Sequence, residues 1–365
     1  MSHGFRPKNY FDDIAFYLVF IYGFLISLVQ MKNPDFSMKL FNNDLFQISL
    51  YISGYFILKN INISHQQKIT VVWCLIFGIL TNCFYLFNSF YFLGQYGREG
   101  GFMDNPNQVA LSIVLAIAFI VYRISVTEKR FSRLIYIGMV FFLLFVFPVT
   151  GSRTGLVILL MTGTLIFIFA SYRAKFTTLI AGIGLVFFFL TQNLENFNIG
   201  ASFVLTNRVI KKTNEEEKDV RFILWDGALK TASDSYFTGI GIGQFKAKFA
   251  RIFQTTYHET ILQVVNRRAY LSAHSDYIAL ITIYGIVGLL LYLFYLFRNT
   301  LNILRNIRFA NSFKEQRFYQ FCLMILACLA AFGLTAENFI SPIYWLLLAV
   351  STSTFVPLLG EERGK

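Results

Sequence analysis

A histidine in the last third of the sequence has a side chain suited to proton transfer. His274 lies in the stretch Ala273-His-Ser-Asp-Tyr277, where a long polar interval gives way to a hydrophobic run. Histidine titrates near neutral pH, so it can serve as a general base towards an attacking hydroxyl group. A histidine that only forms hydrogen bonds at the membrane interface is the alternative. His258, in the middle of the polar interval, is a weaker candidate because a solvated position is expected for it.

Arg153 offers a fixed cation in the short segment Gly151-Ser-Arg-Thr-Gly155, which joins two apolar stretches. The flanking glycines let the backbone, and any ligand, approach closely. A lipid-linked phosphate is one partner that such an arginine can bind. The alternative is an arginine that extends its side chain to ordinary lipid phosphates.

Arg221 lies in an aromatic segment that is predicted to be helical. At about 100° per residue, Asp219, Asp226 and Lys230 form one polar stripe, and Arg221 falls outside it. An arginine with apolar neighbours needs an anionic partner, because an unpaired buried charge is very costly. That partner is either a structural carboxylate, such as Glu337 or Asp276, or a diphosphate held by two parallel hydrogen bonds.

Two further segments of the sequence contain glycine or basic residues that could contribute to such a site. Gly239-x-Gly241-x-Gly243 follows no βαβ pattern, which argues against a dinucleotide site and favours a backbone nest or a tightly packed loop. The loop 98–107 is predicted to cap the next helix through Asn105 or Asn107, and its Arg98 adds to the basic residues.

The composition determines the class of protein that must position these residues. The chain is 56% hydrophobic, has 43 Phe and only 14% charged residues, whereas soluble domains have about 25% charged residues. An all-α polytopic membrane protein is therefore expected. The net charge of +12 belongs to residues that flank the membrane spans, and no compact basic domain indicates nucleic acid. The four cysteines lie in apolar stretches without disulfide or metal-ligand spacing.

A bilayer needs about 20 apolar residues per helix, and by that measure we predict about ten spans. They cover residues 14–31, 43–58, 69–93, 107–124, 134–150, 154–172, 176–192, 275–297, 318–336 and 339–359. The first is expected to be a retained signal-anchor. The chain thus divides into N-terminal transmembrane helices (1–192), a large extracytoplasmic loop with interfacial helices (193–273) and C-terminal transmembrane helices (274–365). In the helix at 275–297, His274, Ile278, Ile281, Gly285 and Gly288 are predicted to share one face, where the glycines permit tight helix packing.

The positively charged residues of the short loops predict the orientation. About 17 Lys and Arg fall on one side and about four on the other, so both termini are expected in the cytoplasm and the long loop outside. No charged residue is predicted near the middle of a span. A charge-coupled transporter would be expected to have some there.

In this order, the motifs resemble the bacterial O-antigen ligase and polymerase superfamily. The resemblance covers the sequence from about residue 70 onward. It rests on Gly-Phe-x-x-Asn-Pro-Asn at 101–107, Ser152-Arg153-x-Gly155, Arg221-x-x-x-Trp225 with the glycine segment, and Ala273–Tyr277 followed by Gly285-Ile-Val-Gly288.

The resemblance implies a GT-C-like fold and a metal-independent, inverting glycosyltransferase that needs no cofactor. Its donor would be a glycan on undecaprenyl diphosphate at the outer face of the bacterial inner membrane. Arg153 and Arg221 match the diphosphate-binding arginines of the family, with Arg98 as a further candidate. His274 matches the essential histidine, with Asp276 as the residue that orients it. The sequence itself has no Asp-x-Asp pair of the kind that binds a divalent metal.

The resemblance leaves the acceptor open. A polymerase would join repeat units of O-antigen, capsule or exopolysaccharide, and a ligase would move a finished glycan to lipid A–core or to a protein. A chain-length regulator and a flippase are expected as protein partners. A transporter of lipid-linked oligosaccharide is the alternative from another class, but the sequence has neither polar residues through the midplane nor symmetric repeats. A structural membrane partner is the third alternative, but it would not require Arg221 to lie off the polar stripe.

Overall fold

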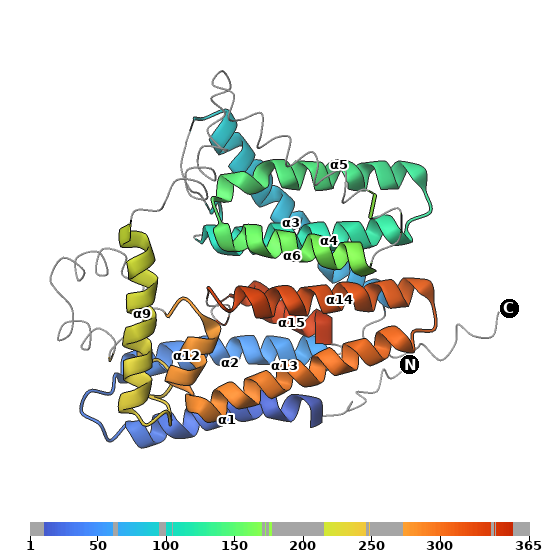
Figure 1. Ribbon diagram of the computed structural model, residues 1–365. Helices are drawn as coiled ribbons and strands as arrows, with labels where there is room; N and C mark the ends of the chain where they lie inside the picture. Colours follow the sequence, from blue (N-terminus) through green and yellow to red (C-terminus); the bar gives the residue numbers. More distant parts are fainter. Residues whose placement is uncertain are drawn as a thin grey trace. The chain divides into compact units, whose positions relative to one another are not determined.

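The computed structural model describes residues 11–60, 65–94, 100–103, 105–169, 172, 175–176, 215–245, 248, 273–336, 339 and 341–352. Within these ranges every regular element is a helix (Figure 1). Arg98, His258, Glu337 and residues 177–192 of the predicted span at 176–192 lie outside the described residues.

The chain forms two compact units. Unit 1 consists of Met1–Asn62, Asn214–Asn302 and Leu329–Ser353, and unit 2 of Ile63–Thr213, Ile303–Cys328 and Thr354–Lys365. The helices of each unit therefore come from distant parts of the sequence.

Unit 2 is built around α4 (Pro106–Val126), which packs against α3 (His65–Tyr91), α5 (Arg130–Val146) and α6 (Arg153–Phe169) (Figure 1). Almost every side chain of α4 from Val109 to Ile124 is buried. The helix begins at Pro106, which suits a first helical position, and the side chain of Asn105 accepts a hydrogen bond from the backbone N–H of Asn107 at 3.0 Å. This confirms the predicted cap. Most of α14 (Phe313–Phe332), up to Cys328, also belongs to this unit.

Unit 1 combines α1 (Phe11–Gln30), α2 (Met38–Asn60), α9 (Glu215–Asp234), α12 (Asp276–Ile283), most of α13 (Gly285–Arg308) and α15 (Pro342–Thr352). The short helix α15 packs along α2, and α9 packs against α12. In Figure 1, α9 runs at a steep angle to α1 and α13 instead of alongside them. That direction is typical of a helix at the membrane surface.

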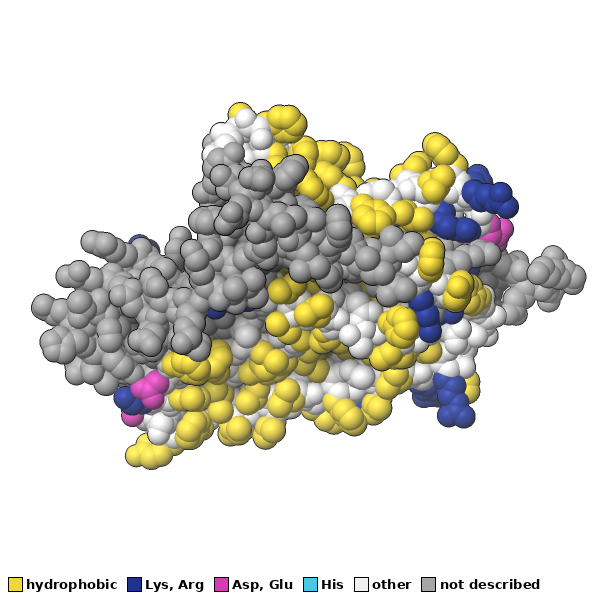
Figure 2. Space-filling view, turned by 45° about the horizontal axis from the view of Figure 1, so that its top comes forward, with side chains coloured by type: hydrophobic (Ala, Val, Ile, Leu, Met, Phe, Trp, Pro, Cys, Tyr) yellow, Lys and Arg dark blue, Asp and Glu magenta, His cyan; other side chains and the backbone are white. Residues whose placement is uncertain are grey.

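Five described helices are long and apolar enough to cross a membrane. They cover Asp13–Gln30, Gln66–Tyr91, Pro106–Val126, Arg130–Thr150 and Gly285–Arg308, and Arg153–Phe169 and Pro342–Thr352 are shorter apolar helices. The face drawn in Figure 2 has broad stretches of hydrophobic side chains, with Lys and Arg in small groups. A lipid-facing surface explains why large hydrophobic side chains such as Phe77 and Phe131 are exposed. The chain is thus an all-helical membrane protein, as expected.

The prediction of one helix at 275–297 is wrong. α12 ends at Ile283 and α13 begins at Gly285, whose backbone φ of 68° belongs to the left-handed region. Hence His274, Ile278 and Gly285 do not share one helix face. The apolar run is continuous in sequence and hides this break.

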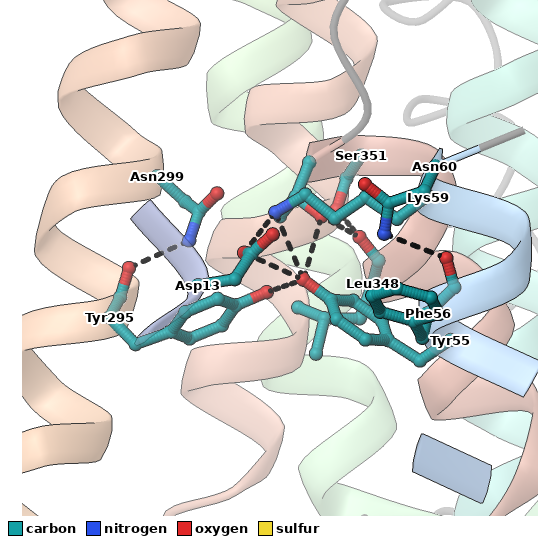
Figure 3. Close-up of polar contacts among 10 residues, drawn as sticks. Asp13, Tyr55, Phe56, Lys59, Asn60, Tyr295, Asn299, Leu348 and Ser351 are labelled. Atoms are coloured by element: carbon teal, nitrogen blue, oxygen red, sulfur yellow. Dashed lines mark hydrogen bonds and ion pairs between the residues drawn. The ribbon is translucent and has the colours of Figure 1, made fainter. Parts of the chain in front are cut away.

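A buried polar cluster joins α1, α2 and α13 of unit 1 (Figure 3). Lys59 forms an ion pair with Asp13, and their side chains are 10% and 8% exposed. The Tyr55 hydroxyl lies 3.2 Å from Asp13 Oδ1 and 2.7 Å from the Tyr295 hydroxyl, and Lys59 Nζ donates to it at 3.0 Å. Phe16 stacks on Tyr295 with ring centroids 4.5 Å apart. These contacts connect the first turn of α1 and the last turn of α2 with the middle of α13.

Candidate functional site

The turn that carries His274 has an unusual backbone conformation. His274 has φ of 48°, in the left-handed region that non-glycine residues seldom adopt. Ser275 then caps α12, its Oγ accepting from the N–H of Ile278 at 3.5 Å. The cap is therefore Ser275, and His274 projects from the turn before the helix with a half-buried side chain. Strained residues of this kind cluster at functional sites because the surrounding structure must hold them in place.

Hydrogen bonds with α9 and with the residue that follows α14 hold this turn in place. On one side, the indole Nε1 of Trp225 in α9 donates to the carbonyl of Ala273 at 3.0 Å. On the other, the carbonyl of Gly333, just after α14, accepts from the N–H of Asp276 at 2.8 Å and from Ser275 Oγ at 3.2 Å. These bonds fix the backbone on either side of His274. The role of Trp225 could be anticipated only as part of the Arg221-x-x-x-Trp225 motif.

Asp276 is buried, with 1% of its surface exposed. A Cβ atom on Gly333 would lie 2.7 Å from Asp276 Oδ2, so only glycine leaves space for the carboxylate there. The Asp276 charge also acts on the hydroxyls of Tyr292 and Tyr344, which lie 2.7 Å from each other. Sequence reasoning missed Gly333 and both tyrosines, because they follow Asp276 at separations that no local pattern covers.

The glycine segment is a packed loop, the second of the two interpretations offered for it. Gly239, Gly241 and Gly243 have φ values of 101°, 90° and 75°. The N–H groups of Ile240 and Gly241 donate to the carbonyls of Thr282 and Ile283, both at 3.0 Å. The next N–H, that of Ile242, donates to Ser27 Oγ at 2.8 Å. Three consecutive donors are thus used within the protein and do not form an anion nest.

The same segment explains the break between α12 and α13. The carbonyls of Thr282 and Ile283 would be acceptors in a continuous helix, but the glycine segment supplies their partners. In addition, the N–H of Ile286 donates to the Phe237 carbonyl at 2.9 Å. A Cβ atom on Gly285 would lie 2.5 Å from the carbonyl oxygens of Phe237 and Thr238. Gly285 therefore permits close approach of a loop, and not the packing of two helices.

Beyond the glycines, the chain forms hydrogen bonds with the last residue of α1 and with the residue before α2. Gln244 Oε1 accepts from the N–H of Ser37 at 2.8 Å, and Lys248 Nζ donates to Gln30 Oε1 at 3.3 Å. Burial lowers the pKa of Lys248, while Asp35 and Asp234 oppose that shift. This part of the predicted loop is firmly bound to unit 1.

Arg221 lies in α9, the helix that holds the His274 turn through Trp225. Two of the three residues of the predicted polar stripe lie together: Lys230 and Asp226 form an ion pair at 3.1 Å, and both side chains are about half exposed. The side chain of Asp219 lies outside the described residues. Leu224 and Ala228 are buried on another face. The side chain of Arg221 lies outside the described residues.

Arg153 begins α6 in unit 2, and its side chain is exposed. The segment before it is tightly ordered: Gly151 has φ of 55°, and Ser152 Oγ accepts from the N–H of Gly155 at 3.0 Å. Ser152 Oγ also donates to Asn107 Oδ1 at 2.8 Å. The motif around Arg153 is therefore joined directly to the Asn-Pro-Asn motif that starts α4.

The Asn-Pro-Asn motif is fixed in turn by α3. Asn82 Oδ1 accepts from the N–H of Phe102 at 2.7 Å, and Asn82 Nδ2 donates to the Gly100 carbonyl at 3.3 Å. Asn82 thus anchors the loop that leads to α4. On the other side of Arg153, a Cβ atom on Gly155 would lie 2.5 Å from the Cβ of Ala110, so this glycine serves the close packing of α6 on α4.

The candidate residues therefore form two groups. In unit 1, His274 and Asp276 share one turn, and α9, which contains Arg221, contacts that turn through Trp225. In unit 2, Arg153 stands on a rigid hairpin linked to residues 105–107.

Together, the helices and these two motif groups define a polytopic membrane protein with a histidine–carboxylate turn that is hydrogen-bonded to α9. Residues 138–293 match the family model for O-antigen ligase, a domain of glycosyltransferase-like enzymes. The match confirms the resemblance to the O-antigen ligase and polymerase superfamily, and it includes Arg153, Arg221, His274 and Asp276. No curated protein matches the chain.

Proposed function

We propose that the protein is a polymerase that transfers glycan from undecaprenyl diphosphate to an acceptor sugar hydroxyl at the outer face of the bacterial inner membrane. The observation that carries the proposal is the turn at His274. His274 has a left-handed backbone conformation, and hydrogen bonds hold the residues on both sides of it. Asp276, two residues later, is buried. These features are typical of a side chain that is fixed in position for catalysis. The family match supports the same chemical class and gives no support to a transporter.

The proposed reaction is a single displacement at the anomeric carbon. The acceptor oxygen forms a bond to that carbon as the bond to the diphosphate oxygen breaks, so the configuration inverts. The acceptor proton goes to an imidazole nitrogen of His274, which Asp276 helps to orient. Charge accumulates on the departing diphosphate, and Arg153, Arg221 and Arg98 are the proposed partners that stabilise it without a metal ion.

A ligase is the second candidate, because the matched family is described as O-antigen ligase and the match fits both activities. It would transfer a finished glycan to lipid A–core or to a protein with the same donor chemistry. Both candidates place the N- and C-termini in the cytoplasm and the site on the opposite side, in accord with the positive charge of the predicted inner loops. A flippase would supply the donor, and a chain-length regulator would act with a polymerase.

Glycan analysis of a host strain that lacks the gene separates these functions. If the protein is a polymerase, surface chains shorten to a single repeat unit on the usual acceptor, and the wild-type gene restores their length. Full-length chains that accumulate on undecaprenyl diphosphate, with none on the acceptor, would identify a ligase. Unchanged glycans would contradict the transferase proposal.

The proposed diphosphate contact of Arg221 can be tested by Arg221→Lys. We expect kcat/KM for the lipid-linked donor to fall roughly 10- to 100-fold, because lysine keeps the charge but cannot donate two parallel hydrogen bonds. Transfer by the purified protein would be measured in detergent at several donor concentrations. Lys230→Arg on the exposed stripe of the same helix is the matched control and should retain wild-type kinetics. Wild-type kinetics in Arg221→Lys as well would count against the contact.

A further inference from the structure

Three arginines gather where the helices of unit 2 end on the side opposite the Arg153 hairpin. Arg123 lies in the last turn of α4, Arg133 in the first turn of α5, and Arg317 in the first turns of α14. Each has an Nε atom that is buried without a hydrogen-bond partner among the described residues. No ion pair with a described carboxylate involves any of the three.

Arg317 lies in a small cleft between α4, α6 and α14. The cleft is lined by Val121, Tyr122, Ser125, Ile166, Phe169, Arg317, Gln320 and Met324. The Nη1 of Arg317 donates to the carbonyl of Phe169, the last residue of α6, and to Gln320 Oε1 at 2.9 Å. Its guanidinium also lies 4.7 Å from the ring centre of Phe313. The side chain is therefore fixed, and its remaining donors have no acceptor in the described protein.

Further cationic groups belong to the same ends of the unit 2 helices. The Arg123 side chain contacts the hydroxyl of Tyr122, which lines the cleft. Arg133 Nη2 donates to the carbonyl of Thr127, directly after α4. Lys68 is 1% exposed, and its charge acts on Cys322, which lies on α14 between Arg317 and Met324. Positive charge is thus concentrated at the end of unit 2 that contains the cleft.

We infer that this cleft binds the headgroup of an anionic phospholipid. A buried N–H of an arginine without an acceptor is unfavourable, and a phosphate diester supplies several charged oxygen acceptors in a geometry that suits guanidinium groups. The position at the ends of membrane helices is the level of the lipid headgroups. Basic pockets between transmembrane helices on the cytoplasmic side commonly bind such lipids. The charge of the loops predicts that this end is cytoplasmic. The inference depends on no part of the proposed glycan transfer.

The test uses the full chain, purified in a neutral detergent with its lipids removed. Thermal unfolding is followed while phosphatidylglycerol, phosphatidylcholine with the same acyl chains, or inorganic phosphate is added. A ligand that binds only the folded protein raises the unfolding temperature until the site is saturated. We expect phosphatidylglycerol to raise it by roughly 2–5 °C, and the other two additives to have little effect. An equal rise with phosphatidylcholine would overturn the inference in favour of nonspecific lipid, and an equal rise with inorganic phosphate in favour of a free anion.

Arg317→Gln assigns the effect to the cleft. Glutamine keeps a polar amide near the position of the arginine Nε but removes the charge, so we expect the phosphatidylglycerol concentration at half-effect to rise about tenfold. Lys314→Gln, one turn earlier on the same helix with an exposed side chain, removes an equal charge and should respond as the wild type does. Arg123→Gln provides a second variant if Arg317→Gln does not fold. A wild-type response in both arginine variants, or an equal loss in Lys314→Gln, would contradict the proposed site.

Discussion

Replacing His274 by asparagine should lower glycan transfer by a factor of about 10² to 10⁴, the usual contribution of a general base. Asparagine is the informative substitution, because it tolerates the left-handed backbone at φ of 48° and retains a polar side chain. Alanine at this position would add backbone strain to the loss of the imidazole. The measurement is the rate of transfer from a purified lipid-linked donor, with thermal unfolding of each variant as the check on folding.

A purely structural role of His274 predicts a different outcome. In that case His274→Asn would retain most of the activity, and any loss in His274→Ala would parallel a loss of stability. The pH dependence gives a second criterion: a general base makes the wild-type rate fall below the pKa of the imidazole, and the residual rate of His274→Asn should lack that fall. Wild-type transfer by His274→Asn in a folded, membrane-inserted protein would refute the proposed base.

The buried ion pair of unit 1 carries the largest expected effect on stability. Asp13→Ala should destabilise the protein by about 3–5 kcal/mol, because it leaves the ammonium group of Lys59 buried without its carboxylate. Tyr55 and Tyr295 would keep their own hydrogen bond at 2.7 Å, but their hydroxyls cannot neutralise the charge. The loss would be measured by unfolding in mixed detergent micelles.

The exposed pair of Asp226 and Lys230 is the matched control, since it belongs to the same unit but is half exposed. Asp226→Ala should cost only about 0.5 kcal/mol. The double variant Asp13→Ala/Lys59→Met should recover much of the stability, because it removes both buried charges. A cost for Asp13→Ala as small as that of Asp226→Ala would show that water reaches the Lys59 ammonium group.

Hydrophobic content was sufficient to predict most helices, but it located their ends poorly. The second span was expected at 43–58, whereas α2 extends over Met38–Asn60. The missed residues at its start include Lys39 and Asn42, which a search for apolar residues discards although they continue the helix. The break between α12 and α13 was missed for the opposite reason. The residues around Tyr284 are all apolar, and the break depends on N–H groups of Ile240 and Gly241, more than 40 residues away in sequence.

In the site, too, residues that are adjacent in sequence could be predicted, whereas their partners from distant parts of the sequence could not. The motifs were sufficient to select His274 and Asp276, because adjacent residues with suitable chemistry are visible in sequence. The partners that hold them were not predictable: Trp225 lies 48 residues before Ala273, and Gly333 lies 58 residues after Ser275. The bond between Ser152 and Asn107 joins two motifs that had been recognised separately, and its separation of 45 residues has no local signature.

The hydrogen bonds between the glycine segment and the α12–α13 break determine how the predicted extracytoplasmic loop (193–273) can be exchanged between relatives. Residues 237–242 and 282–286 complete each other, since each supplies the backbone partners that the other lacks. A chimera that takes the loop from a relative but retains α12 of this chain would combine hydrogen-bond donors from one protein with acceptors from the other. Junctions placed before Ser235 and after Gly288 would transfer both parts together. The interchangeable module of this protein is therefore the loop with its helix break, and not the loop alone.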